Sequence, residues 1–593
     1  MKKNTYIIIA VSLLVSAAAL SFIFSGKSNA GNEVKDSIPA SLVSKVDTTA
    51  KKQKPKKKKV KPKPQVKVDS SLFTNGVVTD KDSLPMKGVI ISDGYTCVAT
   101  DSDGYYALNR NPKARFIYYT VPADCEVPVH SSTDNTAYFY QPVEKNKNSY
   151  DFELTRMPGG VEKIYKMIVI GDPQITNAYS PYFVDGTDNK VQKSDLDRFQ
   201  DETMSDIKQT ISGFPAGMPV YGLSMGDNVQ YYGGYNEKLE GQIRAALGSS
   251  SMKLFSVIGN HDQDGVPLYK QKWEESFGPT DFSFDRGDVH YICINNVHYR
   301  NKTYWQPGEL TADQLKWLAS DLSFVDHSKK IVLSYHVPFT SGNRPIAKKY
   351  PLGIATEKGH YYSTVFQKVM KLLAPFEGGV ELFCGHTHFG NNHDVKYQGK
   401  TIIEHCHAAA CGNIWQSNIN ICGTPNGYYV YSVNGTKISN SYYKGTFWNA
   451  SQQMALFEAD TDFNGESYSA DWNIEKGKHA IVANVFNADY RWKVVAVENG
   501  VEFPMTRISS KGQDAFAAGY HHKYSESVNY WFISKNNGYL IMNHLYYYVP
   551  KSTTSEIVIK ATDPYGNVYT DNAKNVEKEP FYNYAHYYKK NEK

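Results

Sequence analysis

Residues 253–262 read KLFSVIGNHD, and this stretch decides the fold. Its first six residues are mostly apolar, as in a strand that is buried on both faces of a sheet. A glycine follows, and behind it stand Asn260, His261 and Asp262, whose side chains are of the kinds that bind metal ions or transfer protons. Such a strand exit is typical of a catalytic loop in an α/β protein.

The same pattern recurs on both sides of this stretch. Four more apolar runs, KMIVI, VYGLSM, KIVLSY and VELFC, each end at residues that can bind a metal ion. In chain order they are followed by Asp172-Pro173-Gln174, Asp227-Asn228, His336, and His386-Thr387-His388. The carboxyl ends of strands in an open α/β sheet gather around one crevice, so we expect these side chains to lie together. Helical spacing between the runs predicts an α/β layered domain over residues 159–424.

Both flanks of this domain have a different pattern. Short Val/Ile/Tyr/Thr runs separated by Asp-Gly turns predict a small β-sandwich over residues 71–158. Similar runs with Asn-Gly turns predict a second all-β, sandwich-like domain over residues 425–593.

The first 70 residues have the composition of an export signal and a tether. Residues 1–30 hold a lysine pair, a 19-residue uncharged apolar run and Ser28-Asn29-Ala30, as in a cleaved signal peptide or an uncleaved membrane anchor. Residues 31–70 are rich in Lys and Pro and predict a disordered, extended tether. We therefore expect an exported chain, periplasmic or at the cell surface, either secreted or held by this segment.

The net charge is concentrated in that tether. The formal value is +5, but ten lysines in residues 51–67 carry twice that charge, so the rest of the chain is mildly acidic. A body of this kind is not expected to bind nucleic acid. The lysines themselves suit either a solvated spacer or contact with an anionic envelope polymer.

The ordered motifs resemble those of the calcineurin-like metallophosphoesterase superfamily, whose pattern is GDx(H), GDxx, GNH(D/E), a lone His and GHxH. The resemblance covers residues 160–424. The segments GTPNGYYVY (423–431) and ATDPYGNVYT (561–570) and the N-terminal β-module are similar to an exported bacterial branch of that superfamily. The resemblance implies a four-layer αββα-type catalytic domain.

The resemblance also implies a ligand set for two divalent metal ions. One ion is held by Asp172, Gln174, Asp227 and His388, and the other by Asp227, Asn260, His336 and His386. It implies that metal-bound hydroxide attacks a phosphate ester while His261 protonates the leaving oxygen, with Asp262 as the residue that orients His261.

The sequence departs from many family members at Gln174, where they have His. An amide oxygen is a harder and weaker ligand than imidazole, so this site is expected to favour Mn or Fe(II), although Zn and Co stay open. Asn228, Tyr231 and Trp415 are candidate substrate contacts, and Tyr232 is a further residue of the same loop.

The sequence is compatible with more than one substrate and more than one function. The substrate is either a phosphomonoester or a phosphodiester. Two other functions remain: a glycan- or envelope-binding surface protein with a vestigial esterase core, and a phosphoprotein phosphatase. One pair among Cys406, Cys411 and Cys422 is either bridged or left as free thiols, and His405 and His407 are expected to be structural.

Overall fold

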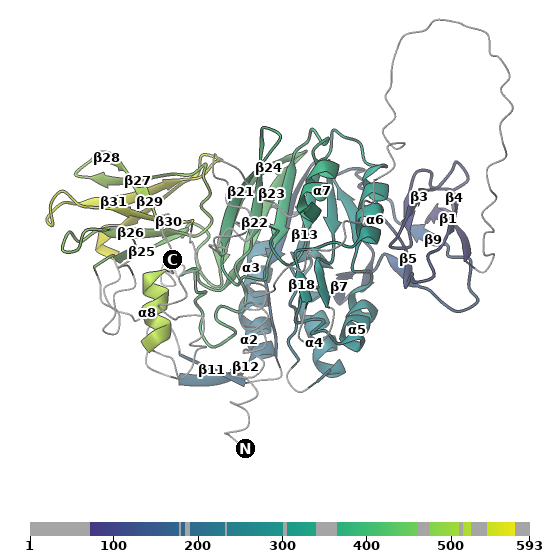
Figure 1. Cartoon of the computed structure of the whole chain (residues 1–593), viewed down its shortest axis with the longest axis horizontal. Coiled ribbons are helices and arrows are strands. Elements are labelled where there is room, and N and C mark those ends of the chain that lie inside the picture. The colour runs from purple at the N-terminus through teal and green to yellow at the C-terminus, as the bar shows by residue number, and fades with distance from the viewer. Residues whose placement is uncertain are drawn as a thin grey trace, which may run out of the picture.

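The computed structural model describes residues 72–575, apart from 177–178, 184–189, 232–233, 300–304, 340–363, 461–468, 470–471, 473, 509–513 and 524–542. The expected signal segment, the tether and Tyr232 lie outside the described residues. Among the described helices, none combines the length and apolarity needed to span a membrane. Figure 1 shows the N-terminal strands on the right, the catalytic sheets in the middle and the C-terminal strands on the left.

Two mixed sheets form the centre of the molecule. The first has seven strands in the order β24 (Lys437–Gly445), β23 (Gly427–Asn434), β10 (Ile164–Ile170), β13 (Val220–Ser224), β14 (Lys253–Ser256), β7 (Asp134–Ala137) and β6 (Val129–Ser131). The second has six strands in the order β15 (Phe282–Arg286), β16 (Val289–Cys293), β19 (Lys330–Ser334), β20 (Val380–Cys384), β22 (Lys400–Cys406) and β21 (Asn391–Tyr397). The five apolar runs that precede candidate ligands all lie in these two sheets, three in the first and two in the second.

The two sheets pack face to face. Met167 and Val169 of β10 share one buried cluster with Tyr291 of β16 and Phe383 of β20. The hydroxyls of Tyr165 and Tyr291 meet across this interface at 2.8 Å. This contact satisfies two buried polar groups between the sheets, which would otherwise cost free energy.

Helices cover the outer face of each sheet. Ile168 and Ile170 pack with apolar residues of α3 (Ser205–Ser212), α4 (Glu237–Leu247) and α5 (Pro267–Phe277). Leu333 of the second sheet packs with residues of α6 (Ala312–Leu322) and α7 (Thr364–Leu373). Alternate residues of each strand thus face the other sheet and the helices, which is why the runs are apolar throughout.

Smaller elements complete the catalytic region. Before α3 the chain runs through α2 (Asp195–Arg198) and a π-helical turn, η2 (Phe199–Met204). The hairpins β11–β12 (Tyr179–Phe183 and Lys190–Ser194) and β17–β18 (Val297–Tyr299 and Trp305–Pro307) extend from it.

The N-terminal region is joined to the first sheet by hydrogen bonds. Its own strands form two small sheets: β4 (Tyr105–Asn109), β1 (Phe73–Asp80) and β9 (Phe152–Leu154); and β3 (Cys97–Ala99), β2 (Ile90–Ser92), β5 (Phe116–Tyr119) and β8 (Tyr140–Pro142). However, β6 and β7 leave these sheets, and β7 pairs with β14 of the catalytic sheet. Two strands of the expected module at 71–158 are therefore part of the catalytic sheet.

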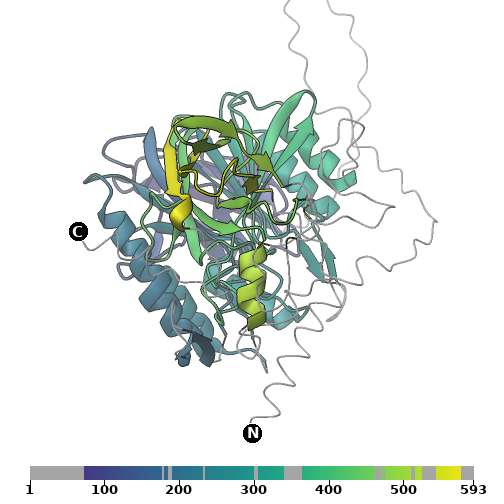
Figure 2. The ribbon, with the colours of Figure 1, turned by 90° about the vertical axis from the view of Figure 1, so that its left-hand side faces the viewer.

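The C-terminal region differs from expectation in two ways. First, β23 and β24 fall within the expected C-terminal domain but pair with β10, so the catalytic sheet extends to residue 445. Second, α8 (Ala515–Lys523) stands below the remaining strands (Figures 1 and 2), so the region is not all-β. Those strands form two sheets. The first has the order β25 (Met454–Glu458), β26 (Ile481–Val485), β30 (Leu545–Tyr548) and β29 (Thr506–Arg507), and the second has the order β28 (Val501–Pro504), β27 (Lys493–Glu498), β31 (Ile557–Thr562) and β32 (Val568–Asn572). A 3₁₀ turn, η5 (Ala573–Asn575), follows the last strand.

A buried Asp–His–Asp network links the second sheet to α6. His290 of β16 lies 2.7 Å from Asp285 through Nδ1 and 2.9 Å from Asp321 through Nε2. Asp321 also accepts a hydrogen bond from Ser283, which meets Thr120 of the N-terminal region at 2.8 Å. Burial alone lowers the pKa of His290, but the two carboxylates outweigh burial and raise it to about 9.

We predict that His290→Leu lowers the free energy of unfolding by about 3–5 kcal/mol, because it leaves the buried Asp321 carboxylate without its charged partner, while Asp285 keeps Lys329. In the wild type, the stabilisation from His290 is fully present below its unfolded pKa of 6.5 and is lost as the pH rises through about 9. Urea unfolding at pH 7 and pH 10 checks both effects. The variant should lose less stability than the wild type over this interval, and an equal loss would contradict the assignment.

Candidate metal centre

The candidate ligands come from five loops at the carboxyl ends of strands. Asp172 follows β10, Asp227 follows β13, Asn260 follows β14, His336 follows β19 and His386 follows β20. Asp172, Asp227 and His336 are at most 1% exposed. The two sheets thus deliver ligands to one buried place, as the sequence pattern predicts.

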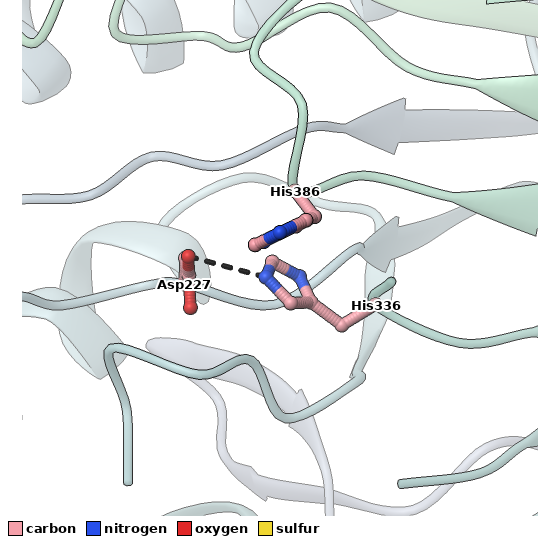
Figure 3. A group of neighbouring side chains, drawn as sticks. All are labelled: Asp227, His336 and His386. Carbon is pink, nitrogen blue, oxygen red and sulfur yellow. Dashed lines mark ion pairs between the residues drawn. The ribbon is translucent and has the colours of Figure 1, made fainter. Parts of the chain in front are cut away.

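Two clusters of metal-binding side chains share Asp227. One is Asp227, His336 and His386, and the other is Asp172, Asp227 and His388. Within each cluster the ligand atoms all lie within 4.8 Å of one another. Figure 3 shows the first cluster, in which Asp227 Oδ2 lies 3.1 Å from His336 Nε2. Carboxylate and imidazole groups at this spacing suit divalent cations.

The backbone is strained at five of the seven candidate ligands. Four of these residues have φ between 42° and 70°, and Asp172 has φ of 33°. The left-handed region is rarely occupied by residues other than glycine, and such strain persists only where the surroundings impose it. Strain of this kind concentrates at functional sites. The strained residues are Asp172, Gln174, Asp227, His386 and His388.

Two glycines are required because the loops approach each other closely. A Cβ atom on Gly259 would stand 2.1 Å from Asp227 Oδ1, and one on Gly385 would stand 2.6 Å from Asp172 Oδ2. Any other residue at either position would displace a candidate ligand.

Gln174 provides a test of whether the site fits a metal. Its amide Nε2 donates to Gln230 Oε1 at 2.8 Å, and this bond fixes which end of the amide faces the site. Its Oε1 atom is buried and has no hydrogen-bond partner among the described residues. A buried carbonyl oxygen without a partner is costly unless a ligand meets it. The residues present therefore fit a cation, and Gln230 is an orienting residue that the sequence reasoning missed.

His336 is held in the tautomer that a metal ligand needs. Its Nδ1 donates to the Met225 carbonyl at 2.8 Å, which leaves Nε2 facing Asp227 and, at 3.0 Å, the Asn260 amide oxygen. Burial lowers the pKa of His336, but the charge of Asp227 outweighs burial and raises it to about 10. Cation binding at Nε2 requires release of that proton.

The two buried carboxylates have opposite shifts. Burial raises the pKa of Asp172, and the charge of Asp227 adds to the rise. Burial also acts to raise the pKa of Asp227, but nearby His336 and His261 outweigh it and hold the pKa below its usual range. Two carboxylates in one buried place repel each other, and a divalent cation offsets both charges.

The residue that faces His261 is Asp264 rather than Asp262. Asp262 accepts the backbone N–H groups of Gly259 at 2.8 Å and Val229 at 3.1 Å, so it shapes the loops instead of orienting His261. Asp264 Oδ1 lies 3.5 Å from His261 Nδ1. The sequence could suggest Asp264 only through its nearness to His261, because its direction depends on a positive φ of 44°.

The three candidate substrate contacts are buried. Trp415 is 0% exposed, and its Nε1 donates to the Pro173 carbonyl at 2.8 Å. The Tyr231 hydroxyl donates to Glu240, and Asn228 accepts a hydrogen bond from Ser224. These contacts give all three residues a part in positioning the loops, and their contact with substrate stays a prediction.

The described cysteines, together with His405 and His407, have structural contacts. All seven cysteines are buried and free, so no pair among Cys406, Cys411 and Cys422 is bridged. His405 contacts Asn392 and Glu381, and His407 contacts the Tyr431 hydroxyl and the Cys384 carbonyl. Both histidines are satisfied, as expected for structural residues.

Two family models match the chain on either side of this centre. Residues 73–157 match the model described as the N terminal of calcineurin-like phosphoesterase. Residues 404–569 match the model described as the C terminal of calcineurin-like phosphoesterase. No sequence among curated proteins matches the chain.

Several solved structures are similar to parts of the chain. A dimetal phosphatase from Danio rerio is 11% identical, covering 48% of this chain and 96% of its own, with a TM-score of 0.32. A purple acid phosphatase from yellow lupin (Lupinus luteus) seeds is 12% identical, covering 60% and 67%, with a TM-score of 0.30. A streptococcal ancillary pilin is 10% identical, covering 21% and 48%, with a TM-score of 0.12. Structural similarities this low do not identify a family, so the two family models carry that evidence.

The two matched models flank the loops that gather the aspartate and histidine ligands. The chain thus matches the calcineurin-like phosphoesterases on both sides of its candidate metal centre, which supports a metal-dependent phosphoesterase.

Proposed function

We propose that the chain is a hydrolase that cleaves phosphate esters with two divalent metal ions. The observation that carries this proposal is the pair of clusters that share Asp227. A carboxylate with two oxygens can serve two cations at once, and cations held about 3.5–4 Å apart can clamp a phosphoryl group between them. Bound in this way, the ions would supply charge neutralisation and an acidified water.

We further propose which residues hold each ion. Asp172, Gln174, Asp227 and His388 would hold one, and three of these four donors are oxygen ligands. Asp227, Asn260, His336 and His386 would hold the other. The oxygen-rich set favours Mn or Fe(II) over softer ions.

His261 is proposed as the group that protonates the leaving oxygen. It follows the ligand Asn260, and its backbone N–H donates to Asp227 Oδ1 at 2.7 Å, so the loop ties it to the centre. Its side chain is 12% exposed, so the ring is not fully buried. In the metal-free chain, burial lowers the pKa of His261, but Asp227 and Asp264 outweigh burial and raise it to about 9.

Replacing Asp264 by Asn is expected to lower kcat roughly tenfold while metal content stays unchanged, because the acid loses its oriented partner but keeps its place. Metal content of the purified variant and steady-state kinetics check this. Asp262→Asn is the informative comparison, since it disturbs two backbone hydrogen bonds and should also lower stability. An unchanged kcat in Asp264→Asn would remove Asp264 from this role.

The function is tested by loading the full chain with Mn, Fe, Zn or Co and assaying an aryl phosphomonoester and a phosphodiester. Hydrolysis of one or both with about two equivalents of metal is the expected result. Inactivity with every metal and both substrates would contradict the proposal. If the chain bound polysaccharide but no metal, the result would instead support the alternative of a binding protein with a vestigial esterase core.

We also propose that the chain is exported and that residues 51–67 contact an anionic envelope polymer. The proposal is supported by the apolar run before residue 30 and by the ten lysines without an acid. Fractionation of cells that make the full chain tests export, and recovery only in the cytoplasm would contradict it.

A further inference from the structure

Residues 411–426, which we call the brace, connect the metal centre to the C-terminal region. We propose that the brace holds the Asp172-Pro173-Gln174 loop in its ligating shape and depends on α8 for its own shape. The C-terminal region then becomes a positioning part of the metal centre. This inference rests on the proposed function, because it concerns how proposed metal ligands are held.

The inner end of the brace contacts the first ligand loop directly. Trp415 Nε1 donates to the carbonyl of Pro173 at 2.8 Å. Pro173 stands between Asp172 and Gln174, and proline has no backbone N–H, so this carbonyl is its only polar backbone group. Ala410, just before the brace, adds a backbone bond to the Gly171 carbonyl at 2.7 Å.

The brace is strained at this contact. Ile414 has φ of 48° and Trp415 has φ of 60°, and a left-handed conformation is a rare outlier for a β-branched residue. Consecutive strained residues persist only where the surroundings over-determine them. The strain thus marks the place where the brace is forced against the ligand loop.

Arg198 fixes the inner end from the other side. Its side chain is fully buried and donates to the Trp415 carbonyl at 2.5 Å. Its guanidinium also lies 5.2 Å from the centre of the indole ring. A cation over an indole face adds attraction in a buried setting, so ring and backbone of Trp415 are both held.

The outer end of the brace is held by the C-terminal region. His521 of α8 is 0% exposed, and its Nε2 lies 3.0 Å from Ser417 Oγ. The same hydroxyl oxygen accepts the backbone N–H of Ile419 at 3.1 Å. Asn413 N donates to the Ser417 carbonyl at 3.2 Å, which closes the turn that contains Trp415.

A second contact holds the end of the brace. Asn484 Nδ2 donates to the Cys422 carbonyl at 2.7 Å and to Asp514 Oδ2 at 2.9 Å. A Cβ atom on Gly423 would stand 2.4 Å from the Asp514 side chain, so the two regions meet without room for a larger residue. The path from α8 to Pro173 is thus continuous and buried.

The experiment measures hydrogen exchange of the Gln174 and Ile175 amides in the metal-free full chain. These amides donate to the Asp227 and Asn228 carbonyls, so their exchange reports the shape of the ligand loop. Trp415→Phe keeps the ring and removes the N–H, and His521→Leu removes the contact to Ser417. Both variants should exchange about tenfold faster at these amides, because each removes a buried hydrogen bond that holds the brace or the ligand loop.

A conservative variant and a matched control separate positioning from general loss of stability. His521→Gln keeps a donor for Ser417 and should restore slow exchange. Tyr548→Phe removes a buried hydroxyl bond to Glu498 elsewhere in the C-terminal region and should leave these amides unchanged. Equal exchange in His521→Leu and Tyr548→Phe, or in Trp415→Phe and the wild type, would overturn the inference.

Metal titration supplies a second readout. Trp415→Phe and His521→Leu should each weaken metal binding by about 10–100-fold. Their combined effect should fall short of the sum, because both act on one path. If the wild type bound no metal, the proposed function would fail, while the exchange measurement would still decide whether α8 holds the ligand loop.

Discussion

Asp227→Asn is expected to abolish binding of both proposed metal ions and to lower hydrolysis by at least about 10³-fold, as when a group central to catalysis is lost. Asn keeps the shape of the side chain and can still accept the backbone N–H of His261. It loses the negative charge and the second acceptor oxygen that faces His336. Because both clusters contain Asp227, one substitution should weaken both sites together.

Metal analysis after dialysis and steady-state assays check this expectation. Asp206→Asn is a matched control, since Asp206 is also a buried carboxylate of the catalytic region and its partners are Lys444 and Tyr428. The control should keep its metal and most of its activity. Full metal content in Asp227→Asn would refute a shared carboxylate.

His261→Ala should retain metal and lose about 10²–10⁴-fold in turnover, the usual contribution of a general acid. The loss should depend on the leaving group. An alkyl leaving group needs a proton when its bond breaks, whereas a nitrophenolate leaves readily without one. The variant should therefore lose much more activity on an alkyl phosphate ester than on a nitrophenyl ester.

Parallel assays of the two esters, with metal content measured on the same samples, check the role of His261. An equal loss on both esters would mean that His261 stabilises phosphate oxygens rather than protonating the leaving group. Loss of metal in the variant would mean that the residue supports the ligand loops. An unaffected rate would remove His261 from the site.

The sequence predicted that the strand-end loops converge because the relevant signals are local. A buried strand is visible as an apolar run, and a glycine before a ligand is visible as a dipeptide. The rule that strand ends converge then brings Asp172, Asp227 and His336 together without any knowledge of side-chain angles. The same rule says nothing about which sheet each strand joins.

Side-chain direction within the loops could not be predicted in this way. Asp262 and Asp264 are separated by one residue, and only the backbone turn decides which carboxylate meets His261. Trp415 was expected to contact substrate because it is an aromatic residue in a loop near the site, but its strained backbone turns the indole inward toward Pro173. Such directions depend on contacts between distant segments, which a single sequence does not display.

The pairing of strands across the predicted domain boundaries could not be predicted for a related reason. The pairing of β10 with β23 joins residues about 265 positions apart, and no local pattern marks it. The second half of the N-terminal module is correctly predicted to form strands. A strand-like sequence does not, however, specify which strand it pairs with, and β7 pairs with β14 of the catalytic sheet. The helical segment α8 was missed because its short sequence, AFAAGYHHK, shows no helical period.

The strand order of the first sheet also has a consequence for synthesis. Its two edges are formed by β6 near one end of the chain and by β24, which is made more than 300 residues later. Until β23 emerges from the ribosome, β10 has an unpaired edge that can template pairing with another chain. Sheets assembled from such distant segments fold slowly. A fragment that stops at residue 424 would keep every candidate ligand yet is expected to aggregate, and one that continues past Gly445 should remain soluble longer.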